Sequence, residues 1–297
     1  MTRMLRTLIV FVLVLAVASP AVAGDKLFLW KVEGKNATVH MTGSIHVGRP
    51  EFYPLPTAIG EAFLHADALA VEVDISDQEV MQKAGQITMT RGMLPGDETL
   101  ESSVDPEIYA RLKAYAAVRG INLSMYSKFR PSIVAMVLVL EEYKRQGFTE
   151  SEGVDVYFLD AAKKLEKEIR QLETIESQMT LFLEMSDSLD DVLLEEVMNQ
   201  SERLGEVMDS MIATWQAGDA DALSGLLQDQ MGEGPEMEEF YRKLLDDRNV
   251  AIVDIIDYWL GGEEDIFVVV GAGHYGGEMG MLNLLRAKGW TVEQISR

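Results

Sequence analysis

The chain of 297 residues contains no cysteine. Neither a disulfide framework nor a lipid-modified N-terminal cysteine is therefore available to it. Basic residues are also scarce, since 26 Lys and Arg stand against 49 Asp and Glu and give a net charge of −23. A surface this acidic repels nucleic acid and anionic lipid, so we expect no nucleic-acid partner. It would attract a cationic peptide or a metal ion, although acidic helices also simply keep a protein soluble.

Long apolar runs are missing except near the start of the chain. Residues 8–17 are apolar, follow Arg3 and Arg6, and precede the small-x-small sequence at 21–23. The apolar run is shorter than the roughly 20 residues that span a bilayer, so a secretory signal at 1–23 is favoured over an uncleaved anchor. We therefore expect a mature chain of residues 24–297 that is exported to the periplasm or secreted, with no stable membrane insertion.

Histidine is rare, and two of the four histidines share one sequence context. GSIH at 43–46 and GAGH at 271–274 each follow an apolar, strand-like run. Glycine lets the chain turn sharply after a strand and lets a substrate approach the backbone. His40 and His65 lack this context, and we predict structural roles for both.

The hydrophobic pattern predicts an α/β (α+β) protein with one domain over 24–297. Strands are predicted at 27–32, 38–42, 68–73, 169–172, 266–270 and 291–295. Helices are predicted at 58–66, 132–144, 153–167 and 279–288, with a long acidic helical region over 187–256. The domain then divides into an N-terminal β/α half at 24–75, a mainly helical region at 76–260 and a β-α-β unit at 261–297. The chain has 17 methionines, which we expect to fill gaps in the core.

Four side chains that suit metal chemistry stand at the carboxyl ends of predicted strands or in the turns that follow them: His46, Glu72, Glu173 and His274. Ligands of open α/β sheets bind beyond the carboxyl ends of the strands, so a fold that joins both chain ends in one sheet would gather them. Two imidazoles with one or two carboxylates suit zinc, manganese, cobalt or iron. A bound ion would polarise a carbonyl and acidify a water. The alternative is that each glycine serves a tight turn and each histidine packs there.

Several short segments in a fixed order carry a family resemblance. They are FLWKV at 28–32, GSIHVG at 43–48, YPLP at 53–56, AVEVD at 70–74, GVD at 153–155, QLETIESQ at 171–178, WQAGD at 215–219, RN at 248–249 and GAGHYGG at 271–277. With these segments the chain resembles the TraB/GumN family, which is related to the Tiki proteases. The resemblance implies a fold akin to the erythromycin-esterase and ChaN-like superfamily. In such a fold two related β/α halves form a central mixed sheet that carries a large helical insertion.

For the Tiki members the resemblance implies a protease that depends on a divalent metal. Its two G-x-x-H histidines and its glutamate correspond to His46, His274 and Glu72 here. Glu173 is then expected as a second carboxylate ligand, and Arg248 matches a further family position.

Three more expectations concern the surroundings of this site. Gln178 and Asn249 match family positions and are assigned to substrate binding, together with the motif glycines Gly43 and Gly271. Tyr275 stands where an aliphatic residue is common in the family, so we expect it to alter the pocket wall.

The function predicted from these residues is a metal-dependent hydrolase, specifically a peptidase acting on an exported peptide or protein. His46 and His274 would bind manganese, cobalt or zinc, and Glu72 would act as ligand or general base. Arg248 would stabilise an oxyanion or a substrate carboxylate, unless it forms an ordinary structural ion pair.

Three alternatives stay open at this point. The chain would bind haem or iron through its histidines, or sequester a peptide without cleaving it, or hydrolyse an ester without metal by using His46 as a base. Dimerisation through a sheet edge and a lid role for the helical region are also left open.

Overall fold

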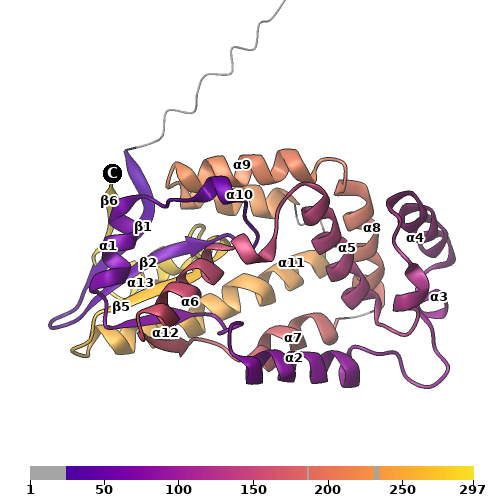
Figure 1. Cartoon of the computed structure of the whole chain (residues 1–297), viewed down its shortest axis with the longest axis horizontal. Helices are drawn as coiled ribbons and strands as arrows, with labels where there is room; N and C mark the ends of the chain where they lie inside the picture. The colour runs from indigo at the N-terminus through magenta and orange to yellow at the C-terminus, as the bar shows by residue number, and fades with distance from the viewer. Residues whose placement is uncertain (1–24, 186, 231–233) are drawn as a thin grey trace, which may run out of the picture.

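The computed structural model describes residues 25–185, 187–230 and 234–297, so the predicted signal at 1–23 lies outside the described residues (Figure 1). The strands are β1 (Lys26–Glu33), β2 (Thr38–Ser44), β3 (Ala68–Val71), β4 (Glu168–Gln171), β5 (Ile266–Gly271) and β6 (Val292–Ser296). The first helices are α1 (Thr57–His65), α2 (Gln78–Arg91), α3 (Leu100–Ser103), α4 (Pro106–Arg119), α5 (Pro131–Arg145), α6 (Val154–Lys164) and α7 (Ile175–Leu183). The later helices are α8 (Asp187–Gln200), α9 (Leu204–Gln216), α10 (Ala220–Gln230), α11 (Pro235–Tyr241), α12 (Asp247–Leu260) and α13 (Met281–Ala287). A π-helical segment, Arg242–Asp246, joins α11 to α12, and a 3-10 turn, Ala272–His274, follows β5.

The six strands form one mixed sheet in the order β4-β3-β5-β2-β1-β6. Strands β4, β3, β5 and β2 run parallel to one another, whereas β1 is antiparallel to both β2 and β6. The predicted mixed α/β class and the predicted β1-β2 hairpin are confirmed. The C-terminal strand-turn-helix-strand unit is also present, but β6 is not the neighbour of β5, because the hairpin lies between them.

The pairing of β2 with β5 joins the two ends of the chain. Gly43 lies opposite Val270, and Ser44 lies opposite Gly271. Strand β5 also pairs in parallel with β3, where Val71 lies opposite Val269. Both Gly-x-x-His turns and the residue that follows β3 therefore lie together at the carboxyl ends of neighbouring parallel strands.

The sheet is buried because its central strands are apolar along their whole length. All six residues of β5 are buried, as expected for a parallel strand covered on both faces. Helix α1 contributes Phe63 and α6 contributes Phe158, and both rings pack against Phe267 of β5 with ring centroids 5.7 and 5.0 Å away. Helices α12 and α13 add further apolar side chains to this core. The strands that carry the site are thus closely packed on both faces of the sheet.

The helical region lies largely to one side of the sheet, with α2 to α5, α7 and α8 on the right of Figure 1. It has apolar clusters of its own, one of which joins α3, α4, α5 and α8. The predicted long helical region at 187–256 divides into separate helices, and Gly218 adopts a φ of +73° at the break between α9 and α10. Among the residues described, no helix combines the length and apolarity needed to span a membrane.

Candidate active site

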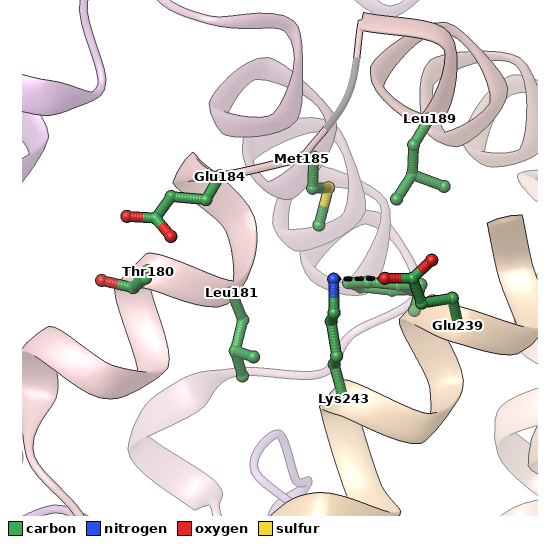
Figure 2. A pocket seen from close by; sticks show the side chains of 8 residues that line it. Thr180, Leu181, Glu184, Met185, Leu189, Glu239 and Lys243 are labelled. Carbon is green, nitrogen blue, oxygen red and sulfur yellow. Dashed lines mark ion pairs between the residues drawn. The ribbon is translucent and has the colours of Figure 1, made fainter.

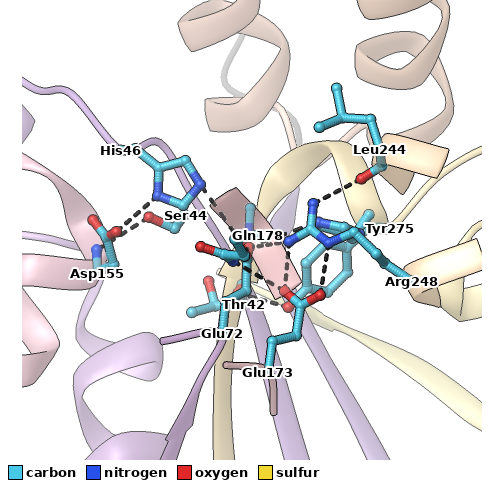
Figure 3. Close-up of polar contacts among 12 residues, drawn as sticks. Thr42, Ser44, His46, Glu72, Asp155, Glu173, Gln178, Leu244, Arg248 and Tyr275 are labelled. Carbon is cyan, nitrogen blue, oxygen red and sulfur yellow. Dashed lines mark hydrogen bonds and ion pairs between the residues drawn. The ribbon is translucent and has the colours of Figure 1, made fainter. Parts of the chain in front are cut away.

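Two histidines and one glutamate converge at the carboxyl ends of β2, β5 and β3 (Figure 3 shows His46 and Glu72). The Nε2 atom of His46 lies 3.8 Å from Oε1 of Glu72. The Nε2 atom of His274 lies 3.9 Å from the same oxygen. One carboxylate oxygen is therefore shared between the two imidazoles, whose turns come from opposite ends of the chain.

Each histidine is oriented by a hydrogen bond at its other ring nitrogen. Nδ1 of His46 lies 2.7 Å from Oδ2 of Asp155, and Nδ1 of His274 lies 2.6 Å from Oδ1 of Asn249. Asn249 donates its Nδ2 to the carbonyl of Met279, so its Oδ1 faces the imidazole as an acceptor. Nδ1 of His274 consequently carries the proton, and its Nε2 presents a lone pair. Bonds of this kind fix the ring orientation of metal-binding histidines.

The two histidines differ in exposure and in charge. The His274 side chain is 3% exposed, and its burial lowers the pKa to about 4, which keeps the ring neutral at pH 7. The His46 side chain is 58% exposed. Desolvation lowers the pKa of His46, but the carboxylates of Asp155 and Glu72 outweigh it and raise the value to about 9. Without a bound cation, His46 is thus the charged member of the pair.

Glu72 accepts hydrogen bonds at both of its carboxylate oxygens. Oε1 accepts from the backbone N–H of Gly271 at 2.6 Å. Oε2 accepts from Nη2 of Arg248 at 2.5 Å and from Nε2 of Gln178 at 2.9 Å. Burial raises the pKa of Glu72, but His274, His46 and Arg248 together lower it to about 2. The side chain is therefore a fixed carboxylate.

Arg248 joins Glu72 to Glu173. Its Nε and Nη2 atoms donate to the two oxygens of Glu173 at 2.7 and 2.6 Å, while Nη1 donates to the carbonyl of Leu244 at 2.7 Å (Figure 3). Leu244 belongs to the π-helical segment, a type of irregularity that is frequent at functional sites. Gln178 also bonds Glu173, at 3.0 Å. The geometry thus gives Arg248 the contacts of a structural ion pair that fixes two carboxylates.

The two motif glycines serve different purposes. A Cβ atom at Gly271 would lie 3.1 Å from Nε2 of His46 and within 3.5 Å of the His274 ring, so a side chain there would enter the site. A Cβ atom at Gly43 would lie 2.4 Å from the Phe28 ring, inside the core. The Gly43 carbonyl accepts a hydrogen bond from the Trp215 indole at 2.9 Å. Gly271 therefore belongs to the site, and the contacts of Gly43 are those of the core.

Tyr275 follows the second histidine and is completely buried. Its hydroxyl donates to the carbonyl of Thr42 at 2.6 Å, and its ring stacks on Trp30 with centroids 5.2 Å apart. This residue therefore connects the turn to the strands β1 and β2 as part of the core packing.

Asp155 is the site residue that sequence reasoning did not single out. It stands in the first turn of α6, and its N–H donates to the Ser44 hydroxyl at 3.1 Å. Its Oδ1 is buried and has no hydrogen-bond partner among the described residues. An acidic residue in the first turn of a helix is ordinary because it offsets the helix dipole, so its type alone carried no signal. Only its place in the GVD segment pointed to it.

The donor set is that of a catalytic zinc-type site, namely two imidazoles and one carboxylate. Two ligands bonded to a tetrahedral ion at about 2.1 Å stand about 3.4 Å apart. The separations of 3.8 and 3.9 Å between Glu72 and the histidines are slightly wider. Within 25–185, 187–230 and 234–297, no group of three His, Cys, Asp or Glu side chains is already close enough to hold an ion.

A hollow of about 440 Å³ lies between α7 and the end of α11 (Figure 2). It is lined by Thr180, Leu181, Glu184, Met185, Leu189, Glu239, Phe240 and Lys243. Lys243 pairs with Glu239 at 2.6 Å, one turn away in the same helical stretch (Figure 2). Helix α7 carries Gln178 one turn before Leu181, so the hollow begins close to the carboxylate cluster, but neither histidine lines it.

The model of the TraB/PrgY/gumN family matches residues 28–294. The chain belongs to this family. The resemblance inferred from the short segments is thereby confirmed. The chain is also 28% identical over 251 residues to an Escherichia coli K12 protein named Uncharacterized protein YbaP, an alignment that covers 84% of this chain and 89% of that protein.

More distant relatives carry an enzyme name. The chain is 21% identical over 325 residues to the Metalloprotease TIKI homolog of Amphimedon queenslandica, covering 92% of this chain and 62% of the relative. It is 22% identical over 319 residues to human Metalloprotease TIKI1, covering 90% of this chain and 61% of the relative. This chain thus spans about three fifths of those proteins. No solved structure matches it.

Proposed function

We propose that the protein is a metal-dependent hydrolase that cleaves peptide bonds. The observation that carries the proposal is the convergence of two Nε2 atoms on one Glu72 oxygen, at 3.8 and 3.9 Å. The hydrogen bonds at Nδ1 aim both Nε2 atoms at that point, and a divalent ion would take the place of the proton on His46. Similarity to proteins named metalloproteases supports the same reaction class.

Each residue of the cluster has a distinct role in this proposal. His46 and His274 bind the ion through Nε2, and Glu72 binds it through Oε1. A manganese, cobalt or zinc ion there would polarise the substrate carbonyl and acidify a water. The pKa of about 2 makes Glu72 a poor proton acceptor at neutral pH, so the role of ligand suits it better than that of general base.

Arg248 and Gln178 position the carboxylates. Both donate to Oε2 of Glu72, which leaves Oε1 facing the histidines. Arg248 directs its Nε and Nη2 to carboxylates and one Nη1 hydrogen to the Leu244 carbonyl, so we assign it to positioning and not to the oxyanion. Glu173 supports the same arrangement by holding Arg248 from its other side.

The proposal is tested first by metal content. Protein purified without an affinity tag is incubated with manganese, cobalt or zinc, desalted, and analysed by elemental mass spectrometry. We expect near-stoichiometric metal in the wild type and its loss in the double variant His46→Ala, His274→Ala. The matched control is His65→Ala, because His65 lies on α1 and its one hydrogen bond among the described residues is to the carbonyl of Glu61 in its own helix. Equal metal in all three proteins, or none in any, would refute the proposed site.

Cleavage is tested second, with a mixture of unstructured peptides and mass-spectrometric detection. We expect cleavage by the metal-loaded wild type, loss of cleavage with a chelator, and recovery when the metal is restored. Metal binding without any peptide cleavage would reject the peptidase activity while leaving the metal site in place.

A metal-free hydrolase is the second candidate. The 2.7 Å contact between His46 and Asp155 has the geometry of the His–Asp pair in serine hydrolases, where the carboxylate orients the base. The raised pKa of about 9 opposes it, because a histidine that is protonated at pH 7 cannot accept a proton. Hydrolysis that persists in excess chelator would favour this candidate. The haem-binding and peptide-sequestering alternatives stay predictions, as does export.

A further inference from the structure

An apolar cavity of about 250 Å³ lies among α5, α8, α9, α10 and α11. Apolar side chains dominate its wall, in contrast to the hollow with the Lys243–Glu239 pair. The side chains that matter here are Leu204, Val207, Met208, Met211, Leu227 and Met237. Three of these six are methionines, which are flexible and adapt to apolar groups of different shapes.

One wall of this cavity packs against the turn that carries His46. Met208 forms a buried cluster with Val47, the residue directly after His46, and with Phe148. Met211 and Ile45, the residue directly before His46, pack on the same cluster. The cavity is therefore separated from the first histidine turn by a single layer of side chains.

Another wall of the cavity contacts the turn that carries His274. A Cβ atom at Gly273 would lie only 2.7 Å from Cδ1 of Leu227, so Leu227 rests directly on the backbone of that turn. Helix α10, which carries Leu227, packs against the 3-10 turn Ala272–His274. The cavity thus borders both histidine turns, although they belong to opposite ends of the chain.

We propose that this cavity is a specificity pocket that receives one apolar side chain of a peptide substrate next to the reacting bond. The inference rests on the proposed peptidase function. The volume of about 250 Å³ is below the roughly 300 Å³ at which sites for drug-sized ligands begin, and it suits a single large side chain such as that of leucine, methionine or phenylalanine. Its place beside both histidine turns would hold the neighbouring peptide bond near Glu72.

The cavity should make the protein selective for an apolar side chain at one position of the peptide. Removing an apolar side chain of this size from water favours the apolar peptide over a polar one by about tenfold to a hundredfold. The effect concerns one substrate position only, because the cavity accepts one side chain.

Binding is tested by methyl NMR of the full chain with ¹³C-labelled methionine, using N-acetyl-leucinamide as the probe and N-acetyl-serinamide as the polar control. We expect saturable shifts for Met208, Met211 and Met237 with the first compound only. Met89, which is 58% exposed on α2, is the internal reference and should not shift. The same titration in the His46→Ala, His274→Ala variant should give the same shifts, because the pocket does not need the metal. No saturable shift, or an equal shift at Met89, would overturn the proposal.

Two substitutions at one position alter the pocket in opposite directions. Met211→Trp fills it and should weaken N-acetyl-leucinamide binding at least tenfold, and Met211→Ala enlarges it and should improve binding of N-acetyl-tryptophanamide. The matched control Met89→Trp should change neither. Far-UV circular dichroism and thermal melting show whether each variant folds. If Met211→Trp does not fold, the Met211→Ala result decides whether the cavity is the proposed pocket.

Cleavage profiling separates this inference from the proposed function. In a peptide library varied at one position beside the scissile bond, the wild type should prefer leucine, methionine or phenylalanine. Met211→Trp should shift that preference at least tenfold towards alanine and serine. An unchanged profile would overturn the pocket and leave the peptidase standing. No cleavage by any protein would reject the peptidase, and the NMR titration would still decide the pocket.

Discussion

Replacement of Arg248 by methionine tests whether this arginine holds two buried carboxylates together. The arginine side chain is 13% exposed, and its partners Glu72 and Glu173 are 10% and 11% exposed. Removing one partner from a buried ion pair leaves uncompensated charge and costs about 3 to 5 kcal/mol. Methionine keeps much of the apolar volume, so we assign a loss of this size at pH 7 to the charge.

The loss should depend on pH in a definite direction. In the wild type, burial raises the pKa of Glu72, but His274, His46 and Arg248 together lower it to about 2. This value lies below the roughly 4.3 of an unfolded glutamate, so the pairing stabilises the fold above pH 4.3 and is lost as the pH falls towards 2. Without Arg248 the pKa of Glu72 rises from about 2, although His274 and His46 still lower it. At acidic pH the folded variant then binds more protons than the folded wild type, so its deficit should shrink as the pH falls below about 4.3.

The assay is urea unfolding at about pH 7 and at about pH 3.5, below the roughly 4.3 of an unfolded glutamate, with EDTA present. Arg242→Met is the control, because Arg242 is 50% exposed in its pair with Asp247 and should cost less than about 1 kcal/mol. The double variant Arg248→Met, Glu173→Gln should regain part of the loss, because one buried charge is gone. A cost below about 1 kcal/mol for Arg248→Met, or the same cost at both pH values, would refute this reasoning.

Three further predictions concern the histidine turns. Asp155→Asn should lower the pKa of His46 from about 9 and weaken metal binding about 10- to 100-fold, as measured by NMR titration and calorimetry, and an unchanged metal affinity would contradict the orienting role. Gly271→Ala should abolish metal binding with little change in the melting temperature. Gly43→Ala should instead destabilise the fold by about 1 to 3 kcal/mol through overpacking. The reverse pattern would show that the two glycines are misassigned. Because burial lowers the pKa of His274 to about 4, its contribution to stability should diminish as the pH falls from about 6.5 towards 4, and an NMR titration midpoint near 6.5 would contradict this.

The strands were predictable because their apolar runs are continuous and end at turn residues. The run at 266–270 is fully buried as β5, and the runs at 27–32 and 38–42 form the expected hairpin. Strand order was not predictable in the same way. Nothing in the local pattern specifies that the hairpin pairs between β5 and β6, because that choice depends on contacts between distant segments.

The candidate site was predictable where a residue follows a strand, and unpredictable where its partner comes from a helix. His46, Glu72 and His274 each follow a strand, so the topology alone brings them together. Asp155 and Asn249 project from α6 and α12, and their bonds to the imidazoles depend on how those helices pack on the sheet. Sequence periodicity reports which face of a helix is buried, and it does not report which side chain of another element that face will meet.

The pairing of β2 with β5 has a consequence for biosynthesis. Strand β5 occupies the centre of the sheet, between β3 and β2, yet β3 ends at Val71 and β5 begins only at Ile266. Contacts between such distant segments slow folding, because a long loop must close before they form. The central sheet is incomplete until β5 has emerged, and every product truncated before residue 266 lacks both β5 and His274. The candidate active site therefore forms only after β5 and the turn that carries His274 have been synthesised.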